Sequence, residues 1–183
     1  KIIKRFLAFS SNNHVGFILL GIMSYELMSE RTIFFYLIID LITTFGIFAV
    51  ILNLRSGNGE LTKISELNGL RFSSRSKSIS MLVFLFSLAG IPPFAGFFAK
   101  FFILSASINE GLYILSVIAV VSSVIAAFYY LSVIKNMFFN DKDNDLLLDN
   151  NKIGSFVFIS SALILTLFFF YPDPLINLVD GLF

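Results

Sequence analysis

The longest apolar run of the sequence, residues 79–108, reads ISMLVFLFSLAGIPPFAGFFAKFFILSASI. It exceeds the roughly 20 residues that a helix needs to cross the hydrocarbon core of a bilayer. Two prolines, Pro92 and Pro93, interrupt it. Because proline has no backbone N–H, the carbonyls of Leu88 and Ala89 lose their helical partners, and such a break is tolerated only where it packs in protein or faces water. The run therefore predicts a broken transmembrane helix; a plain proline kink is the alternative.

The whole chain has the composition of a membrane protein. Of its 183 residues, 57% are apolar and 14% are charged, and the mean hydropathy is +0.88. A soluble domain carries about 25% charged residues. We therefore expect an all-α integral membrane protein with about five transmembrane helices in a single membrane domain, residues 1–183. The expected helices cover residues 6–25, 32–54, 79–108, 112–139 and 153–171, and the polar loops cover residues 55–78 and 140–152.

Basic residues predict the orientation. If the chain crosses the membrane five times, eleven of its 13 lysines and arginines fall on one side, Arg31 falls on the other, and Lys100 lies inside a span. Loops on the cytoplasmic or matrix side carry such an excess. The N-terminus is therefore expected on that side and the C-terminus on the opposite side. The eleven are Lys1, Lys4, Arg5, Arg55, Lys63, Arg71, Arg75, Lys77, Lys135, Lys142 and Lys152.

The first long loop has an apolar pattern of its own. Leu61, Ile64, Leu67 and Leu70 recur at every third position. This spacing predicts a short amphipathic helix along the membrane surface; a polar linker is the alternative.

Three expected helices carry an ionisable side chain at mid-depth: His14, Asp40 and Lys100. A lysine at the centre of a helix in lipid costs about 2.5–3.5 kcal/mol, so it normally faces protein or water. We interpret Lys100 as a titratable site that loads and releases a proton; the alternative is a lysine that extends to the interface. A row of such groups suits a lateral proton relay, and histidine exchanges protons near neutral pH.

Other roles stay open for two of these groups. For His14 the alternative is a neutral, hydrogen-bonded side chain that only packs. For Asp40 the options are a counter-ion of His14 or Lys100, a protonated acid, or a group that faces a polar groove. Lys135 lies about one turn from the end of its helix, so we expect it to reach the interface.

Composition excludes several kinds of chemistry. The chain has no cysteine, which excludes disulfides, zinc–thiolate sites and cysteine-ligated iron–sulfur clusters, and its single histidine leaves no multi-histidine metal centre. We therefore expect neither a cofactor nor a metal in this chain. The net charge of +1 also argues against binding to nucleic acid, which needs a clustered basic face.

Three stretches carry a resemblance to a known family: SLAGIPPFAGFFAKF at residues 87–101, KRFLAFSSNNHVGF at residues 4–17 and YYLSVIK at residues 129–135. In order and spacing they resemble the proton-pumping, antiporter-like subunits of respiratory complex I. With LNGL at residues 67–70, the chain is most similar to the chain 2 branch of NADH–ubiquinone oxidoreductase. The resemblance covers nearly the whole chain, but only the last five helices of that fold.

The resemblance implies roles for the buried groups. Lys100 takes the place of the lysine on the broken twelfth helix, an outlet-side proton carrier, and His14 takes that of the tenth-helix histidine on the central polar axis. Asp40 departs from the pattern, which commonly has tyrosine there, so no role is implied for it. The helices of the first half-channel must come from another polypeptide, or the sequence is a piece of a longer protein.

The resemblance implies a subunit of proton-pumping NADH:ubiquinone oxidoreductase that contributes the outlet half of a channel. NADH, FMN, iron–sulfur clusters and ubiquinone would be bound by other subunits. Expected partners are membrane lipid and other membrane-arm subunits, including a chain that supplies the missing helices and the adjacent antiporter-like subunit. The expected location is the mitochondrial inner membrane, or alternatively a bacterial plasma membrane. A subunit of a sodium/proton antiporter and a structural subunit without proton transfer are the alternative functions.

Overall fold

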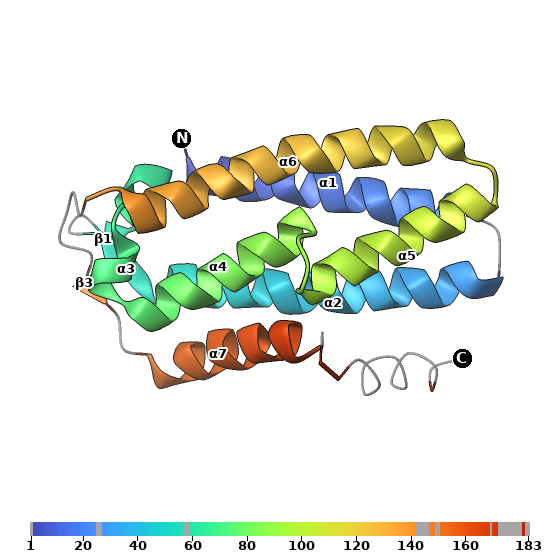
Figure 1. Cartoon of the computed structure of the whole chain (residues 1–183). Helices are drawn as coiled ribbons and strands as arrows, with labels where there is room; N and C mark the ends of the chain where they lie inside the picture. The colour runs from blue at the N-terminus through green and yellow to red at the C-terminus, as the bar shows by residue number, and fades with distance from the viewer. Residues whose placement is uncertain are drawn as a thin grey trace.

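The fold comes from a computed structural model, which describes residues 2–24, 27–56, 59–141, 147–148, 151–168, 170–171 and 181. Its long helices run side by side (Figure 1). The elements in chain order are α1 (Ile3–Met23), α2 (Leu27–Leu52), β1 (Leu54–Ser56), β2 (Gly59–Glu60), the 3₁₀ helix η1 (Ile64–Leu67), α3 (Leu70–Ser73), α4 (Arg75–Ala89), α5 (Ala95–Asn109), α6 (Tyr113–Phe139), β3 (Leu147–Leu148) and α7 (Lys152–Leu167).

The broken pair of helices occupies the middle of the bundle. α4 and α5 lie end to end, with α1 and α6 along one side and α7 along the other (Figure 1). α2 packs against α1, α4, α5 and α7. α6 and α7 also pack against both halves of the pair, but Pro92 and Pro93 in the break itself are exposed on the surface of this chain.

The all-α membrane fold with a broken third span, which the sequence predicts, is confirmed. α1, α2 and α6 are long and apolar enough to cross a membrane, judged by length and composition. α4 and α5, of 15 residues each, share the third expected span, and α7 is a shorter apolar helix of 16 residues. It ends at Leu167, before the expected end at residue 171. The C-terminal residue Phe183 lies outside the described residues, so the side of the membrane that it faces stays a prediction.

The two expected polar loops, residues 55–78 and 140–152, contain more regular structure than the sequence predicts. β1 pairs antiparallel with both β2 and β3, so the sheet order is β2-β1-β3. The strands have only two or three residues, too few to show an alternating pattern. Part of the second loop, residues 142–146 and 149–150, lies outside the described residues.

The start of α4 also differs from the expectation. The helix begins at Arg75 rather than at residue 79, so Lys77 lies in a helix and not in a loop. Lys77 is 4% exposed, and its Nζ donates to the Asn53 carbonyl oxygen at 2.7 Å, just after the end of α2. A cation at a helix C-terminus binds the last carbonyls and favours the helix dipole. The lysine therefore joins the ends of α2 and α4.

Of the apolar residues at every third position, Ile64 and Leu67 lie in a short helix, Leu61 precedes it and Leu70 begins α3. Leu61, Ile64, Leu67 and Leu70 are all buried, and the central part of this segment is the 3₁₀ helix η1. A 3₁₀ helix has three residues per turn, which explains why a spacing of three suits it. η1 packs against α6 rather than lying free on the surface.

Candidate functional site

The end of α4 is a turn that only glycine makes easily. Gly90 has φ +75°, in the left-handed region. Its N–H donates to the Ser87 carbonyl oxygen at 3.0 Å, and the next N–H, from Ile91, donates to the Phe86 carbonyl oxygen at 3.0 Å. This Schellman pattern satisfies two of the last carbonyls of α4. The carbonyl of Leu88, one of the two that the prolines deprive of a helical partner, must find another donor.

α5 approaches the end of α4 closely. The Gly96 N–H donates to Ser87 Oγ at 3.2 Å. A Cβ on Gly96 would collide with the backbone oxygen and the hydroxyl of Ser87. Glycine therefore permits this crossing, which brings Lys100, one turn further along α5, beside the break.

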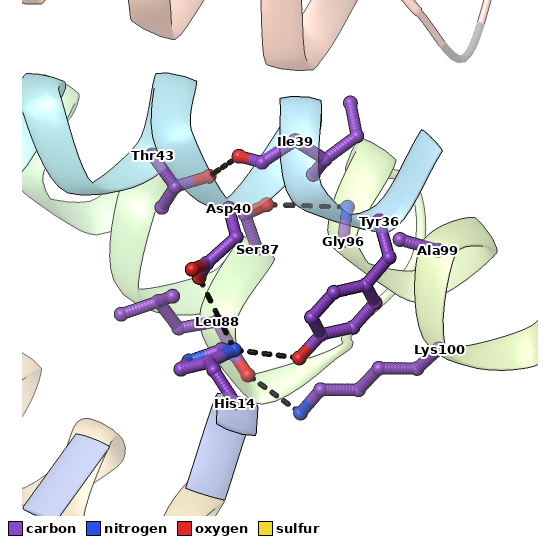
Figure 2. A pocket seen from close by; sticks show the side chains of 10 residues that line it. All are labelled: His14, Tyr36, Ile39, Asp40, Thr43, Ser87, Leu88, Gly96, Ala99 and Lys100. Carbon is purple, nitrogen blue, oxygen red and sulfur yellow. Dashed lines mark hydrogen bonds and ion pairs between the residues drawn. The ribbon is translucent and has the colours of Figure 1, made fainter. Parts of the chain in front are cut away.

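Lys100 is directed into the break. The residue is 6% exposed, and its Nζ donates to the Leu88 carbonyl oxygen at 2.7 Å and to Ser123 Oγ on α6 at 2.9 Å. It also lies 5.1 Å from the centre of the Phe17 ring, within cation–π range. Figure 2 shows the side chain extended toward the end of α4. The carbonyl that the break frees is thus the acceptor of the intramembrane lysine.

His14 and Asp40 form a pair between α1 and α2. His14 Nδ1 lies 3.3 Å from Asp40 Oδ1 and 2.6 Å from the Tyr36 hydroxyl (Figure 2). The side chain of His14 is 7% exposed and that of Asp40 is 24% exposed. The second ring nitrogen, Nε2, is buried without a hydrogen-bond partner in the described part of the chain. Of the partners that the sequence leaves open for Asp40, the structure pairs it with His14.

A small cavity joins this pair to the lysine. The volume open to the centre of a water molecule is about 10 Å³, enough for about one water. The walls come from α1, α2, α4 and α5, so four helices must pack before the cavity exists. Its lining residues are His14, Tyr36, Ile39, Asp40, Thr43, Ser87, Leu88, Gly96, Ala99 and Lys100.

The structure thus brings together the three ionisable residues that the sequence singled out, and adds others that it missed. The sequence could have indicated Tyr36 and Thr43, because they lie four residues before and three residues after Asp40 and so share its face of the helix. Ser87 and Ser123 had no such signal, since their contacts join different helices.

Two further expectations concern residues away from the cavity. Lys135 is exposed near the end of α6, where a lysine can extend to the interface. Among the described residues, no group of three or more His, Asp or Glu side chains could hold a metal ion.

Fold and site together define a class: polytopic α-helical membrane proteins with an interrupted helix and a buried lysine at the interruption. Residues 2–126 match the model of a family described as NADH:quinone oxidoreductase/Mrp antiporter, transmembrane. The chain belongs to this family.

Curated relatives agree with the family resemblance. NADH-quinone oxidoreductase subunit N of Rhodospirillum rubrum is 40% identical over 175 residues, covering 96% of this chain and 36% of the relative. The subunit of the same name in Sphingopyxis alaskensis is 42% identical over 165 residues, covering 89% and 35%. Subunit N corresponds to chain 2, the branch that the sequence resembles. The chain spans little more than a third of the length of these relatives.

Solved structures share the fold. Respiratory complex I from Thermus thermophilus with bound aureothin contains a chain that matches with a TM-score of 0.84 and 24% identity, over 97% of this chain and 40% of that one. The Mrp complex from Dietzia sp. matches with a TM-score of 0.72 and 19% identity, over 91% and 39%.

Proposed function

We propose that this chain forms the outlet half of a proton-translocation channel in the membrane arm of NADH:quinone oxidoreductase. The observation that carries the proposal is the contact of Lys100 with the Leu88 carbonyl that the helix break frees. The Leu88 carbonyl oxygen and Ser123 Oγ accept hydrogen bonds from the ammonium form of the lysine. The serine hydroxyl is also close enough to receive a proton from it.

The cavity supports transfer toward the lysine. His14, Asp40 and Lys100 line one cavity with room for about one water, and a water there can carry a proton from the pair to the lysine. When Lys100 is neutral, its Nζ can accept the proton that this water passes on. Asp40 stabilises the imidazolium form of His14, and the Tyr36 hydroxyl, 2.6 Å from Nδ1, orients the ring.

A serine pair supports release on the side opposite most of the basic loops. Ser123 is the α6 partner of Lys100, and a hydroxyl both accepts and donates a proton. Two helical turns away, about 10 Å along each helix, the hydroxyls of Ser107 on α5 and Ser116 on α6 lie 2.7 Å apart. In this proposal a proton leaves Lys100 through Ser123 and reaches that end of the bundle along the α5–α6 contact.

The proposal extends to the surroundings of the site. Redox chemistry with NADH, FMN, iron–sulfur clusters and ubiquinone belongs to other subunits in this proposal. The missing helices come from the polypeptide that carries the rest of the fold, and the neighbour is another antiporter-like subunit. The membrane is the mitochondrial inner membrane or a bacterial plasma membrane, with the basic loops on the matrix or cytoplasmic side. The matched relatives are named NADH-quinone oxidoreductase subunit N, which favours a complex I subunit over a subunit of a sodium/proton antiporter.

The test compares two lysines. Lys100→Met keeps the length of the side chain but removes titration, so we expect the assembled complex to lose most of its proton translocation and coupled quinone reduction. Lys135→Met, at an exposed position on α6, serves as the matched control and should leave both rates unchanged. Proton translocation and quinone reduction are measured in reconstituted vesicles. Normal pumping by the Lys100→Met complex, at normal assembly, would favour a purely structural subunit.

A further inference from the structure

α2 and α4 pack against each other in opposite directions, and their contact surface, the α2/α4 seam, leads from one end of the bundle to the helix break (Figure 1). At the basic end of the bundle, where the loop of residues 55–78 lies, Lys77 Nζ donates to the Asn53 carbonyl oxygen at 2.7 Å. Seven residues further along α4 and seven residues back along α2, the Phe84 ring lies against Gly46. The equal steps show that the two helices keep one register along the seam.

The other end of the seam is the cavity of the proposed proton site. Three residues beyond the Phe84 contact on each helix, Ser87 and Thr43 both line the cavity that Lys100 also lines (Figure 2). Along α4, Phe84 is about 4.5 Å from Ser87 and about 10.5 Å from Lys77. The phenyl ring therefore lies between the polar contact at the basic end and the proposed proton site.

Polar side chains precede and follow the ring on the same face of α4. Lys77, Ser80, Phe84 and Ser87 recur at spacings of three, four and three, which is the pattern of one helical face. Ser80 is 6% exposed and Ser87 is 2% exposed, so both hydroxyls are buried. A buried water needs two to four polar partners, and hydroxyls one turn away on either side of position 84 could supply them. Phe84 is the apolar interruption of this polar row.

The ring leaves no room for water at its level of the seam. Phe84 is fully buried. A Cβ on Gly46 would collide with the phenyl ring, so the absence of a side chain there lets the ring press against the backbone of α2. Narrow apolar constrictions in membrane channels stop ion movement because they exclude water. The contact of Phe84 with Gly46 has the form of such a constriction.

We propose that Phe84, seated on Gly46, is the seal that closes the proton site toward the basic end. The residue thereby sets the direction of proton transfer. An outlet half-channel must be closed on the side from which protons come, since otherwise a proton on Lys100 returns to that side instead of leaving through Ser123. Phe84 acts by excluding water and exchanges no proton itself. This inference rests on the proposed function of the chain as the outlet half.

The test opens the seal. Phe84→Ala removes the six ring carbons and leaves room for about two or three waters between the hydroxyls of Ser80 and Ser87. In vesicles that contain the assembled complex, we expect NADH oxidation to continue while fewer protons are translocated per NADH. An imposed pH gradient should also decay faster than with the wild-type complex.

Met137→Ala, at another fully buried position, on α6, is the matched control. It should lower the melting temperature of the complex, as Phe84→Ala does, but leave the proton ratio and the gradient decay unchanged. A purely structural role of the ring would make the two variants alike. The same proton ratio and the same gradient decay in both would therefore overturn the inference.

A second pair of variants keeps the test decisive if Phe84→Ala does not assemble. Phe84→Val and Phe84→Thr have nearly the same shape, and the threonine hydroxyl can bond to a carbonyl of its own helix. Threonine adds a polar partner for water, so its pH gradient should decay faster than that of the valine variant. Equal decay in the two would contradict a seal that works by excluding water.

Failure of this inference can be told apart from failure of the proposed function. A Lys100→Met complex that pumps normally would refute the proposed channel, and the seal with it. A Phe84→Ala complex that keeps the wild-type proton ratio would refute only the seal, because Lys100→Met would still abolish pumping.

Discussion

The crossing of α4 and α5 depends on one missing side chain, and Gly96→Ala tests this dependence. The new methyl group would collide with the Ser87 carbonyl oxygen and hydroxyl. The carbonyl cannot yield easily, because it also accepts the Gly90 N–H at 3.0 Å in the turn that ends α4. α5 must therefore move away from α4.

The cost can be worked out from the contacts. Forcing one extra carbon into a packed site costs about 1–3 kcal/mol, and loss of the hydrogen bond from Gly96 N–H to Ser87 Oγ adds about 0.5–1.5 kcal/mol. Lys100 moves with α5. Its bond to the Leu88 carbonyl oxygen is 2.7 Å, so a shift of about 1 Å takes it beyond hydrogen-bond range. We expect Gly96→Ala to lower both the thermal stability of the complex and its proton translocation.

Ser105→Thr is the matched control, since it adds one carbon to the same helix at an exposed position. The assays are the amount of assembled complex, its melting temperature, and protons translocated per NADH oxidised in vesicles. If Gly96→Ala and Ser105→Thr behave alike in all three assays, the close crossing does not position the lysine and the reasoning is wrong.

Two further substitutions test the chemistry of the cavity. Lys100→Arg should lose almost as much proton translocation as Lys100→Met, because a guanidinium does not deprotonate in proteins and its five donors exceed the acceptors at Leu88 and Ser123. Wild-type pumping by the arginine variant would indicate a lysine that only extends to the interface. Asp40→Asn keeps the shape but removes the charge 3.3 Å from His14 Nδ1, so it should slow coupled turnover about a hundredfold, the low end of what a lost proton-transfer partner costs. Turnover within twofold of wild type would show that the pair is structural.

Much of the fold could be predicted because it depends on short-range chemistry. Runs of apolar residues longer than a bilayer require helices, and adjacent prolines remove donors wherever they occur. The deprived carbonyl of Leu88 was therefore visible in the sequence, and so was the buried lysine. The small sheet and the helical position of Lys77 were not visible, because strand pairing and the Lys77–Asn53 contact join segments far apart in the chain.

The sequence by itself thus determined the membrane class, the broken span and the ionisable groups at depth, since each follows from residues close together in the chain. Only the tertiary structure decided how those groups pair. Lys100 lies 12 residues from Leu88, about 18 Å along an uninterrupted helix. Its Nζ is nevertheless 2.7 Å from that carbonyl oxygen, because the break sets the first turn of α5 beside the last turn of α4. Asp40 pairs with His14, whose Nδ1 lies 3.3 Å from Asp40 Oδ1 where α1 and α2 pack together, and it lines the same cavity as Lys100. Such distances depend on the packing of whole helices, which local spacing does not encode.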